Sequence, residues 1–350
     1  MKLVNVTSLL VLLASGMLAS QRPVALDWTL SGPFDGAVTD IVESAAGRLF
    51  AATSKGLYQS TDDGVGWNKC GDVKGNFVRL LNDGRVLVLP SASGYLSYLD
   101  GSCTTRETIV LAADFNSPRS IDALARLKTG RLLASRWNVG LFASDDDGRQ
   151  WRQVPLPPAP NATWLSSIVS LRSGNVIASS GGTVLRSTDN GQTWTATGAP
   201  GGFFRLAVAP SGTLFGLGDG LSRSTDEGRT WNKVAFDRQT VWAMMPGRAG
   251  APRSKSGLAL VAVQDPDRFD NAVYRSRDGG VNWTPAGPEL TGRVNVFVQT
   301  RKGSLIAGTS TGFFRSVNDA ATWKFHGVGP AALNVMAAGG NGMGVIAPGQ

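Results

Sequence analysis

Short apolar segments separated by glycine-containing turns recur along the chain. In one example, an apolar segment at 294–298 is followed by a second at 304–308 and a third at 312–316, with a turn between each pair. Runs of this length, in which apolar and polar positions alternate, are typical of β-strands. We therefore expect an all-β fold.

One octet, Ser-x-Asp-x-Gly-x-x-Trp, follows the third apolar segment of most repeats. Its five complete copies begin at Ser60, Ser144, Ser187, Ser224 and Ser276. A sixth copy has Asn318 and Ala320 in place of the Asp and the Gly, and 97–101 resembles a degenerate copy without the Trp. Successive copies then lie 37 to 52 residues apart. Four strands at such a period predict the blades of a β-propeller.

Each fixed residue of the octet has a predicted role in folding. The Asp can accept hydrogen bonds from backbone amides two residues on, and the Gly supplies a positive φ. The Trp buries a large ring against the neighbouring hairpin. We therefore interpret the five octet carboxylates as structural rather than catalytic: Asp62, Asp146, Asp189, Asp226 and Asp278.

The octet resembles the Asp-box, or BNR repeat. This repeat occurs in sialidases, in endoglucanases of the xyloglucanase type, in sortilin-like receptor ectodomains and in photosystem II stability and assembly factors. The resemblance covers nearly the whole chain after the N-terminus. It implies a β-propeller with the octet on an outer strand turn, but it implies no single function, because these proteins do unrelated things.

The two ends of the chain carry further strand signals. The stretch 27–33 resembles 282–288, so Trp28 is expected to open an outermost strand with no blade before it. Segments 333–338 and 343–347 look like first and second strands with no octet after them. The prediction is seven full repeats plus a split blade from the two termini, giving seven or eight blades.

The N-terminus has the pattern of an export signal. Lys2 is followed by a short apolar run at 9–13 and by small residues up to Ser20, as in a secretory signal peptide. We expect residues 1–20 to be a signal peptide and 21–350 to be a single propeller domain that is periplasmic or secreted. We also expect no transmembrane segment after cleavage, and a monomer.

Composition removes several kinds of chemistry. The 350 residues contain one His, His326, and two Cys, so a zinc site or a His-based nucleophilic mechanism is not expected, and neither is a cofactor. Export permits a disulfide between Cys70 and Cys103, the alternative being two buried thiols. The net charge of +8 fits an acidic partner, glycan or surface; export argues against nucleic acid.

The first strand of each repeat is expected to line a central channel. Aligning the repeats places Asp40, Arg79, Asp122 and Arg205 at similar positions, with two more candidate arginines near strand starts, Arg119 and Arg293. These residues either bind a polar or acidic ligand or form ion pairs across a wet channel. Asp40 and Asp122 are also the candidates for a catalytic pair of carboxylates.

Two function classes remain. The first is a non-catalytic module that binds a protein or assembles a complex, similar to photosystem II stability and assembly factors. The second is a glycoside hydrolase of sialidase-like or endoglucanase-like type. No tyrosine is placed to be a sialidase nucleophile, since Tyr58 and Tyr274 lie just before octets and Tyr95 and Tyr98 flank the degenerate copy. We therefore favour the binding module.

Overall fold

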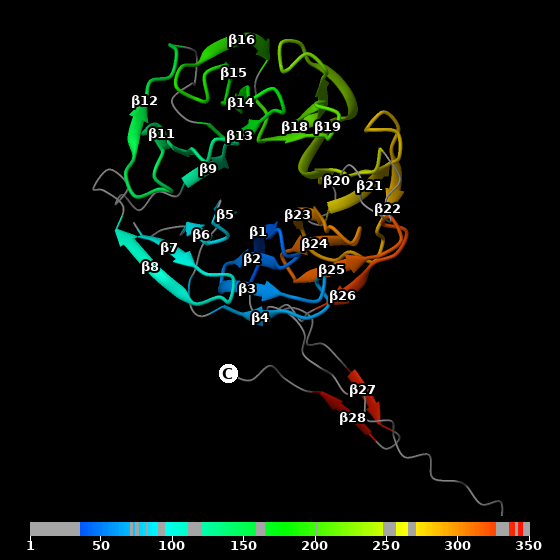
Figure 1. Ribbon diagram of the computed structural model, residues 1–350. Coiled ribbons are helices and arrows are strands. Elements are labelled where there is room, and N and C mark those ends of the chain that lie inside the picture. Colours follow the sequence, from blue (N-terminus) through cyan, green and yellow to red (C-terminus); the bar gives the residue numbers. More distant parts are fainter. Residues whose placement is uncertain are drawn as a thin grey trace, which may run out of the picture.

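The computed structural model describes residues 36–70, 73, 77–81, 83–89, 95–110, 121–158, 165–200, 202–247, 257–264, 271–326, 336–339 and 342–345. These residues contain strands and turns but no helix. The described strands form five four-stranded sheets, one six-stranded sheet that contains two blades, and a separate two-stranded sheet. The ring in Figure 1 therefore has seven blades. The prediction of an all-β propeller is confirmed.

Each blade is an antiparallel meander whose first strand lies beside the central channel and whose last strand lies at the outside (Figure 1). Blade 1 consists of β1 (Val38–Glu43), β2 (Leu49–Thr53), β3 (Gly56–Ser60) and β4 (Asn68–Lys69). Blade 2 consists of β5 (Phe77–Leu80), β6 (Val86–Leu89), β7 (Tyr95–Leu99) and β8 (Thr105–Val110). Blade 3 consists of β9 (Ile121–Arg126), β10 (Leu132–Arg136), β11 (Gly140–Ser144) and β12 (Arg152–Val154). Blade 4 consists of β13 (Ser167–Ser170), β14 (Val176–Ser179), β15 (Thr183–Ser187) and β16 (Thr195–Pro200).

Blades 5 and 6 share one long strand. Blade 5 consists of β17 (Arg205–Val208), β18 (Leu214–Ser224) and the first part of β19 (Asn232–Pro246). Blade 6 consists of the second part of β19, β20 (Ala259–Gln264), β21 (Asn271–Ser276) and β22 (Thr284–Ala286). Blade 7 consists of β23 (Val294–Gln299), β24 (Leu305–Thr309), β25 (Phe313–Ser316) and β26 (Lys324–His326).

The terminal strands do not add an eighth blade to the described ring. β27 (Met336–Gly339) and β28 (Gly342–Val345) are present where first and second strands were expected, but they pair with each other. Trp28 and the predicted signal peptide lie outside the described residues. Of the two outcomes left open, the described residues show seven blades with extra terminal strands.

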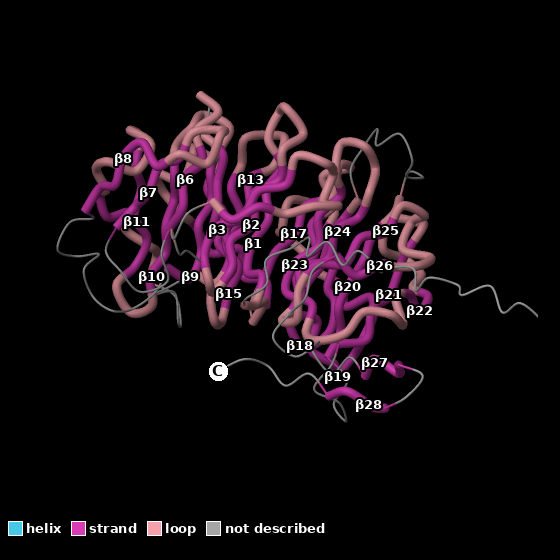
Figure 2. Tube along the Cα trace, turned by 90° about the horizontal axis from the view of Figure 1, so that it is seen from below, coloured by secondary structure: helices cyan, strands magenta, loops and turns pink. Residues whose placement is uncertain are grey.

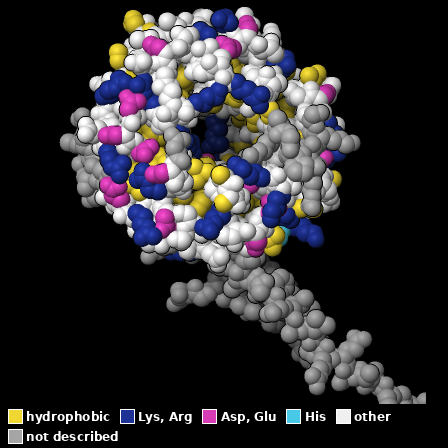
Figure 3. Space-filling view, in the orientation of Figure 1, with side chains coloured by type: hydrophobic (Ala, Val, Ile, Leu, Met, Phe, Trp, Pro, Cys, Tyr) yellow, Lys and Arg dark blue, Asp and Glu magenta, His cyan; other side chains and the backbone are white. Residues whose placement is uncertain are grey.

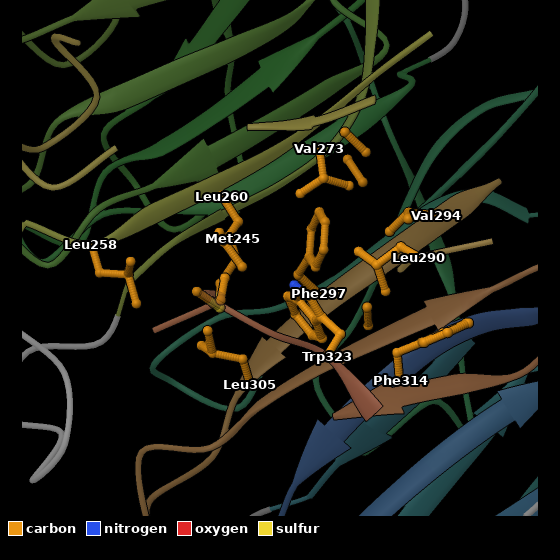
Figure 4. Close-up of a cluster of buried hydrophobic side chains, with 14 residues drawn as sticks. Met245, Leu258, Leu260, Val273, Leu290, Val294, Phe297, Leu305, Phe314 and Trp323 are labelled. Carbon is orange, nitrogen blue, oxygen red and sulfur yellow. The ribbon is translucent and has the colours of Figure 1, made fainter. Parts of the chain in front are cut away.

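The core is divided among the seven contacts between neighbouring blades. Each buried apolar cluster joins one pair of adjacent blades, because both faces of a twisted sheet must be covered by a neighbour. Figure 4 shows the cluster between blades 6 and 7, and Figure 2 shows the blades from the side. Blade 7 closes against blade 1, where Trp67 stacks on Phe313 with ring centroids 4.1 Å apart.

The octet turn has the same hydrogen bonds in all five complete copies. The Ser hydroxyl donates to the Asp carboxylate at 2.7–2.8 Å and accepts the Gly amide at 2.8–2.9 Å. The amide four residues after the Asp donates to the carboxylate at 2.8–2.9 Å. In these copies the expectation of a bond two residues on was wrong, because the amide two residues after the Asp belongs to the Gly and donates to the Ser hydroxyl instead.

The octet Gly also lets neighbouring blades approach closely. A Cβ added at Gly280 would lie 2.8 Å from the Phe215 ring of the preceding blade, and one at Gly191 would lie 2.8 Å from Leu133. In the sixth copy Ala320 takes this place with a φ of 60° and is buried. The turn therefore sets the distance between blades as well as the chain reversal.

Several arginines connect a blade to the octet turn of the next blade. Each arginine directly precedes the Ser of its own octet. Its guanidinium contacts the next blade's octet at the residue before the Gly, or before Ala320 in the sixth copy. The contacts are Arg186–Glu227 (3.0 Å), Arg315–Asp63 (2.6 Å) and Arg275 Nη1 to the Asp319 carbonyl (2.7 Å). Part of the excess basic charge is thus used inside the fold.

Blade 2 is joined to blade 1 in a different way. Its turn lacks the octet Trp, and Asp100 accepts the amides of Ser102 (2.9 Å) and Thr104 (3.0 Å). Cys103, with a φ of 66°, is disulfide-bonded to Cys70 of blade 1, and their Cα atoms are 5.0 Å apart. A covalent bond therefore links these blades where the degenerate octet has lost its packing residue.

Candidate ligand-binding site in the central channel

The first strands run in the same direction around the channel, so it has two different mouths. Asn295 Nδ2 donates to the Val38 carbonyl at 2.9 Å near the strand starts, and the Arg301 amide donates to Glu43 Oε1 at 2.8 Å beyond their ends. We call these openings the start mouth and the end mouth. Figure 3 shows Lys and Arg side chains around and within the central opening.

Asp40 and Arg79 form an ion pair between blades 1 and 2. Asp40 also accepts the amides of Val78 (3.1 Å) and Ile41 (3.0 Å). Arg79 Nη2 donates to the Leu124 carbonyl of blade 3 at 2.8 Å. The carboxylate of Asp40 is thus engaged by a cation and two backbone donors, which leaves it poorly placed to act as a base or nucleophile.

Arg205 reaches across the start mouth from blade 5 to blade 7. Its Nη1 donates to the Asn295 carbonyl at 2.8 Å. Burial among the blades lowers the pKa of Arg205, Asp40 opposes this, and Arg293 and Arg79 add to the lowering. The blades surround Arg205 and desolvate its guanidinium, but the side chain keeps an exposed surface that faces the channel. Three arginines and one aspartate therefore share one electrostatic environment, which has a net positive charge.

Two aromatic rings lie beside these arginines. Arg293 donates to Asn295 Oδ1 at 3.1 Å, and its guanidinium lies 5.3 Å from the Trp242 ring centroid. Phe204, with 49% of its surface exposed, stacks on Trp242 at 5.7 Å between centroids. Trp242 Nε1 donates to Gln264 Oε1 at 2.8 Å, which fixes the ring. An exposed aromatic surface next to guanidinium groups suits a partner with both acidic and apolar groups.

Asp122 lies in a different environment from Asp40. Burial raises its pKa, although the backbone of Trp137 and the charge of Arg136 oppose the rise. Its Oδ2 is buried and has no hydrogen-bond partner among the described residues. The nearby Trp137 is 45% exposed. The structure thus gives the two candidate carboxylates separate surroundings: Asp40 is paired with Arg79, and Asp122 is half-buried beside Trp137.

The structure brings some of the predicted arginines near one another. The charges of Arg79 and Arg293 both lower the pKa of Arg205, whereas Arg119 lies outside the described residues. Sequence reasoning missed Phe204 and Trp242. In the sequence, both aromatic residues lie close to the start of an innermost strand. Residues that pack in the core occupy the same position, so this position does not indicate a binding residue.

The described residues contain no cluster of three or more His, Cys, Asp or Glu side chains able to hold a metal ion. His326 faces the Val65 carbonyl of blade 1 at 3.2 Å, and burial lowers its pKa. No helix in the described part of the chain is long and apolar enough to cross a membrane.

Comparisons with known proteins agree with the fold. The DUF6242 beta propeller domain family matches residues 131–252. Comparison with curated protein sequences gives no match. The structure is similar to the GH74 enzyme of Niastella koreensis, with a TM-score of 0.65 and 16% identity over 86% of this chain and 55% of that one.

Two other similar structures differ in how much of their length is covered. YCF48 bound to D1 peptide has a TM-score of 0.61 and 15% identity over 83% of this chain and 94% of that one. The extracellular domain of BT4673 from B. thetaiotaomicron has a TM-score of 0.63 and 10% identity over 82% of this chain. This chain spans 39% of that domain's length. At such identities the likenesses show the fold alone.

Proposed function

We propose that this chain is an exported, non-catalytic β-propeller that binds a partner protein, or helps assemble a complex, through the start mouth of its channel. The observation that carries the proposal is the cluster of Arg79, Arg205 and Arg293 around a single, already paired Asp40, beside the exposed ring of Phe204. Guanidinium groups in a surrounded, low-dielectric cleft attract carboxylates more strongly than surface arginines do. The segment recognised is therefore acidic and contains apolar side chains.

Three further observations support the proposal. YCF48, which has a similar fold, is known in complex with a D1 peptide. The octets resemble the Asp-box repeats of photosystem II stability and assembly factors. For export, the N-terminal pattern and the Cys70–Cys103 disulfide both fit an oxidising compartment.

The test is binding of a fluorescein-labelled 12-residue peptide of alternating Glu and Phe, measured by fluorescence polarisation. A Gln–Phe peptide controls for charge. We expect Arg205→Ala combined with Arg293→Ala to weaken binding of the acidic peptide by about tenfold or more. The matched control combines Arg106→Ala with Arg229→Ala, which removes two exposed arginines. Equal affinity of both double variants, or of both peptides, would overturn the proposal.

A glycoside hydrolase is the second candidate. Asp122 lies beside the exposed Trp137, and burial raises the pKa of its carboxyl, which is the direction that a general acid requires. Against it, Asp40 is tied to Arg79. The assay is hydrolysis of xyloglucan and of a sialoside by the purified chain and by Asp122→Asn. Turnover that disappears in the variant would establish the enzyme, and absence of turnover in the folded wild type would reject it for these substrates.

A further inference from the structure

A cavity of about 600 Å³ opens at the end mouth, away from the arginine cluster of the start mouth. Its lining residues lie at or just beyond the ends of β9, β13, β17, β19 and β23, so five blades contribute to it. A volume of this size lies within the range of pockets that hold small organic ligands. The cavity is thus large enough for a compact molecule and is separate from the proposed partner site.

The charges that line this cavity have one sign. Lys128 and Arg172 are exposed at its rim, and no Asp or Glu is among the described residues that line it. Lys128 Nζ donates to the Arg172 carbonyl, which holds the ammonium group close to the backbone of blade 4. An anionic group is therefore the complementary ligand feature.

Blades 5, 6 and 7 supply apolar side chains to the lining. Val208, Pro246 and Val298 are half-buried there. Beneath them lie Met245 and Phe297, which come from neighbouring blades and pack together (Figure 4). These two are 7% and 6% exposed, so the wall behind the rim is fixed by the core between blades 6 and 7. Such a wall suits an aromatic or aliphatic body rather than a second charge.

We infer that the end mouth binds a small organic carboxylate with an apolar body. The carboxylate lies at Lys128 and Arg172, and the apolar body lies against Val208, Pro246 and Val298. This site uses none of the residues of the start mouth. The inference is therefore independent of the partner-binding proposal, and each can fail without the other.

The experiment is isothermal titration of the full chain with 1-naphthaleneacetate and with its neutral isostere 1-naphthaleneacetamide. We expect saturable binding of the acetate and about threefold weaker binding of the amide, because the amide has no charge to pair with Lys128 and Arg172 and an exposed ion pair contributes modestly to affinity. Lys128→Gln combined with Arg172→Gln should abolish the preference for the acetate. Ser170→Tyr, which fills the cavity from the end of β13, should weaken both probes.

A matched variant that combines Lys324→Gln with Arg229→Gln removes the same charges from exposed positions on outer parts of the ring and should bind both probes as the wild type does. All variants are first shown to unfold at temperatures close to that of the wild type. Absence of saturable binding, equal affinity for acetate and amide, or an unchanged affinity in Ser170→Tyr would each overturn the inference.

Discussion

The bond between Cys70 and Cys103 is expected to stabilise the closure of blade 1 on blade 2. The two residues are 33 positions apart, and the loop-entropy relation for a loop of that length gives about 3.7 kcal/mol at 25 °C. The ring occupies residues 36–326. With an unfolding entropy of about 2.1 cal/mol/K per residue, this free energy corresponds to a fall in Tm of roughly 6 °C.

The assay compares oxidised chain, chain reduced with a phosphine, and the Cys70→Ala, Cys103→Ala double variant by thermal unfolding and urea titration. The reduced chain and the variant should lose similar stability, and reduction should leave the variant unchanged. Thiol titration of the unfolded, oxidised protein should find no free thiol. Two free thiols, or a fall in Tm below about 1 °C after complete reduction, would refute the assignment of a stabilising role to this bond.

Three other predictions concern single positions in the ring. Because burial raises the pKa of Asp122, ionisation of this carboxyl destabilises the fold as pH rises above about 4, the pKa of an unfolded Asp. Asp122→Asn should therefore raise Tm at pH 7 and lose that advantage below about pH 3. A lower Tm for the variant at pH 7 would contradict this. Gly280→Ala should lower the free energy of unfolding, measured in urea, by about 2–4 kcal/mol, because the new Cβ would lie 2.8 Å from Phe215 at a residue whose φ is 88°. Ala320→Gly should lower it by less than about 1 kcal/mol. Equal losses would contradict the packing argument. Hydrogen bonds from the side chain and backbone of Thr230 lower the pKa of Asp226 to about 2. This carboxylate therefore stabilises the fold above about pH 4, and its contribution is lost as pH falls toward 2. The stability of Asp226→Asn should fall less steeply than that of the wild type over this range, and an equally steep fall would argue against the assignment.

Local patterns predicted most of the fold because the repeated turn is a local structure. Ser, Asp and Gly within one octet make their hydrogen bonds to one another and to amides of the same turn, so the bonds that define it are visible in eight consecutive residues. The substituted copy at Asn318 keeps equivalent bonds at 2.9–3.1 Å, because an amide oxygen accepts as a carboxylate oxygen does. Seven repeats of such turns were enough to predict a propeller.

The site depended on contacts between blades, which the repeat does not specify. The repeat pattern predicted equivalent positions for Asp40 and Asp122, but the strand register shifts them by one residue. Asp40 pairs with Ala52, whereas Ala123 rather than Asp122 pairs with the equivalent Ser135. Arg79 pairs with Asp40, while burial dominates at Asp122. The basic excess was equally ambiguous, because Arg186 and Arg315 hold blades together whereas Arg205 faces the channel.

The sequence by itself determined the strands, their turns and the seven repeats, since these depend on alternation and on bonds within a few residues. The tertiary structure alone decided that the ring closes between blades 7 and 1, which arginines face the channel, and that the end mouth contains a cavity. These features depend on the side chains that meet when residues more than two hundred positions apart become neighbours, as Trp67 and Phe313 do.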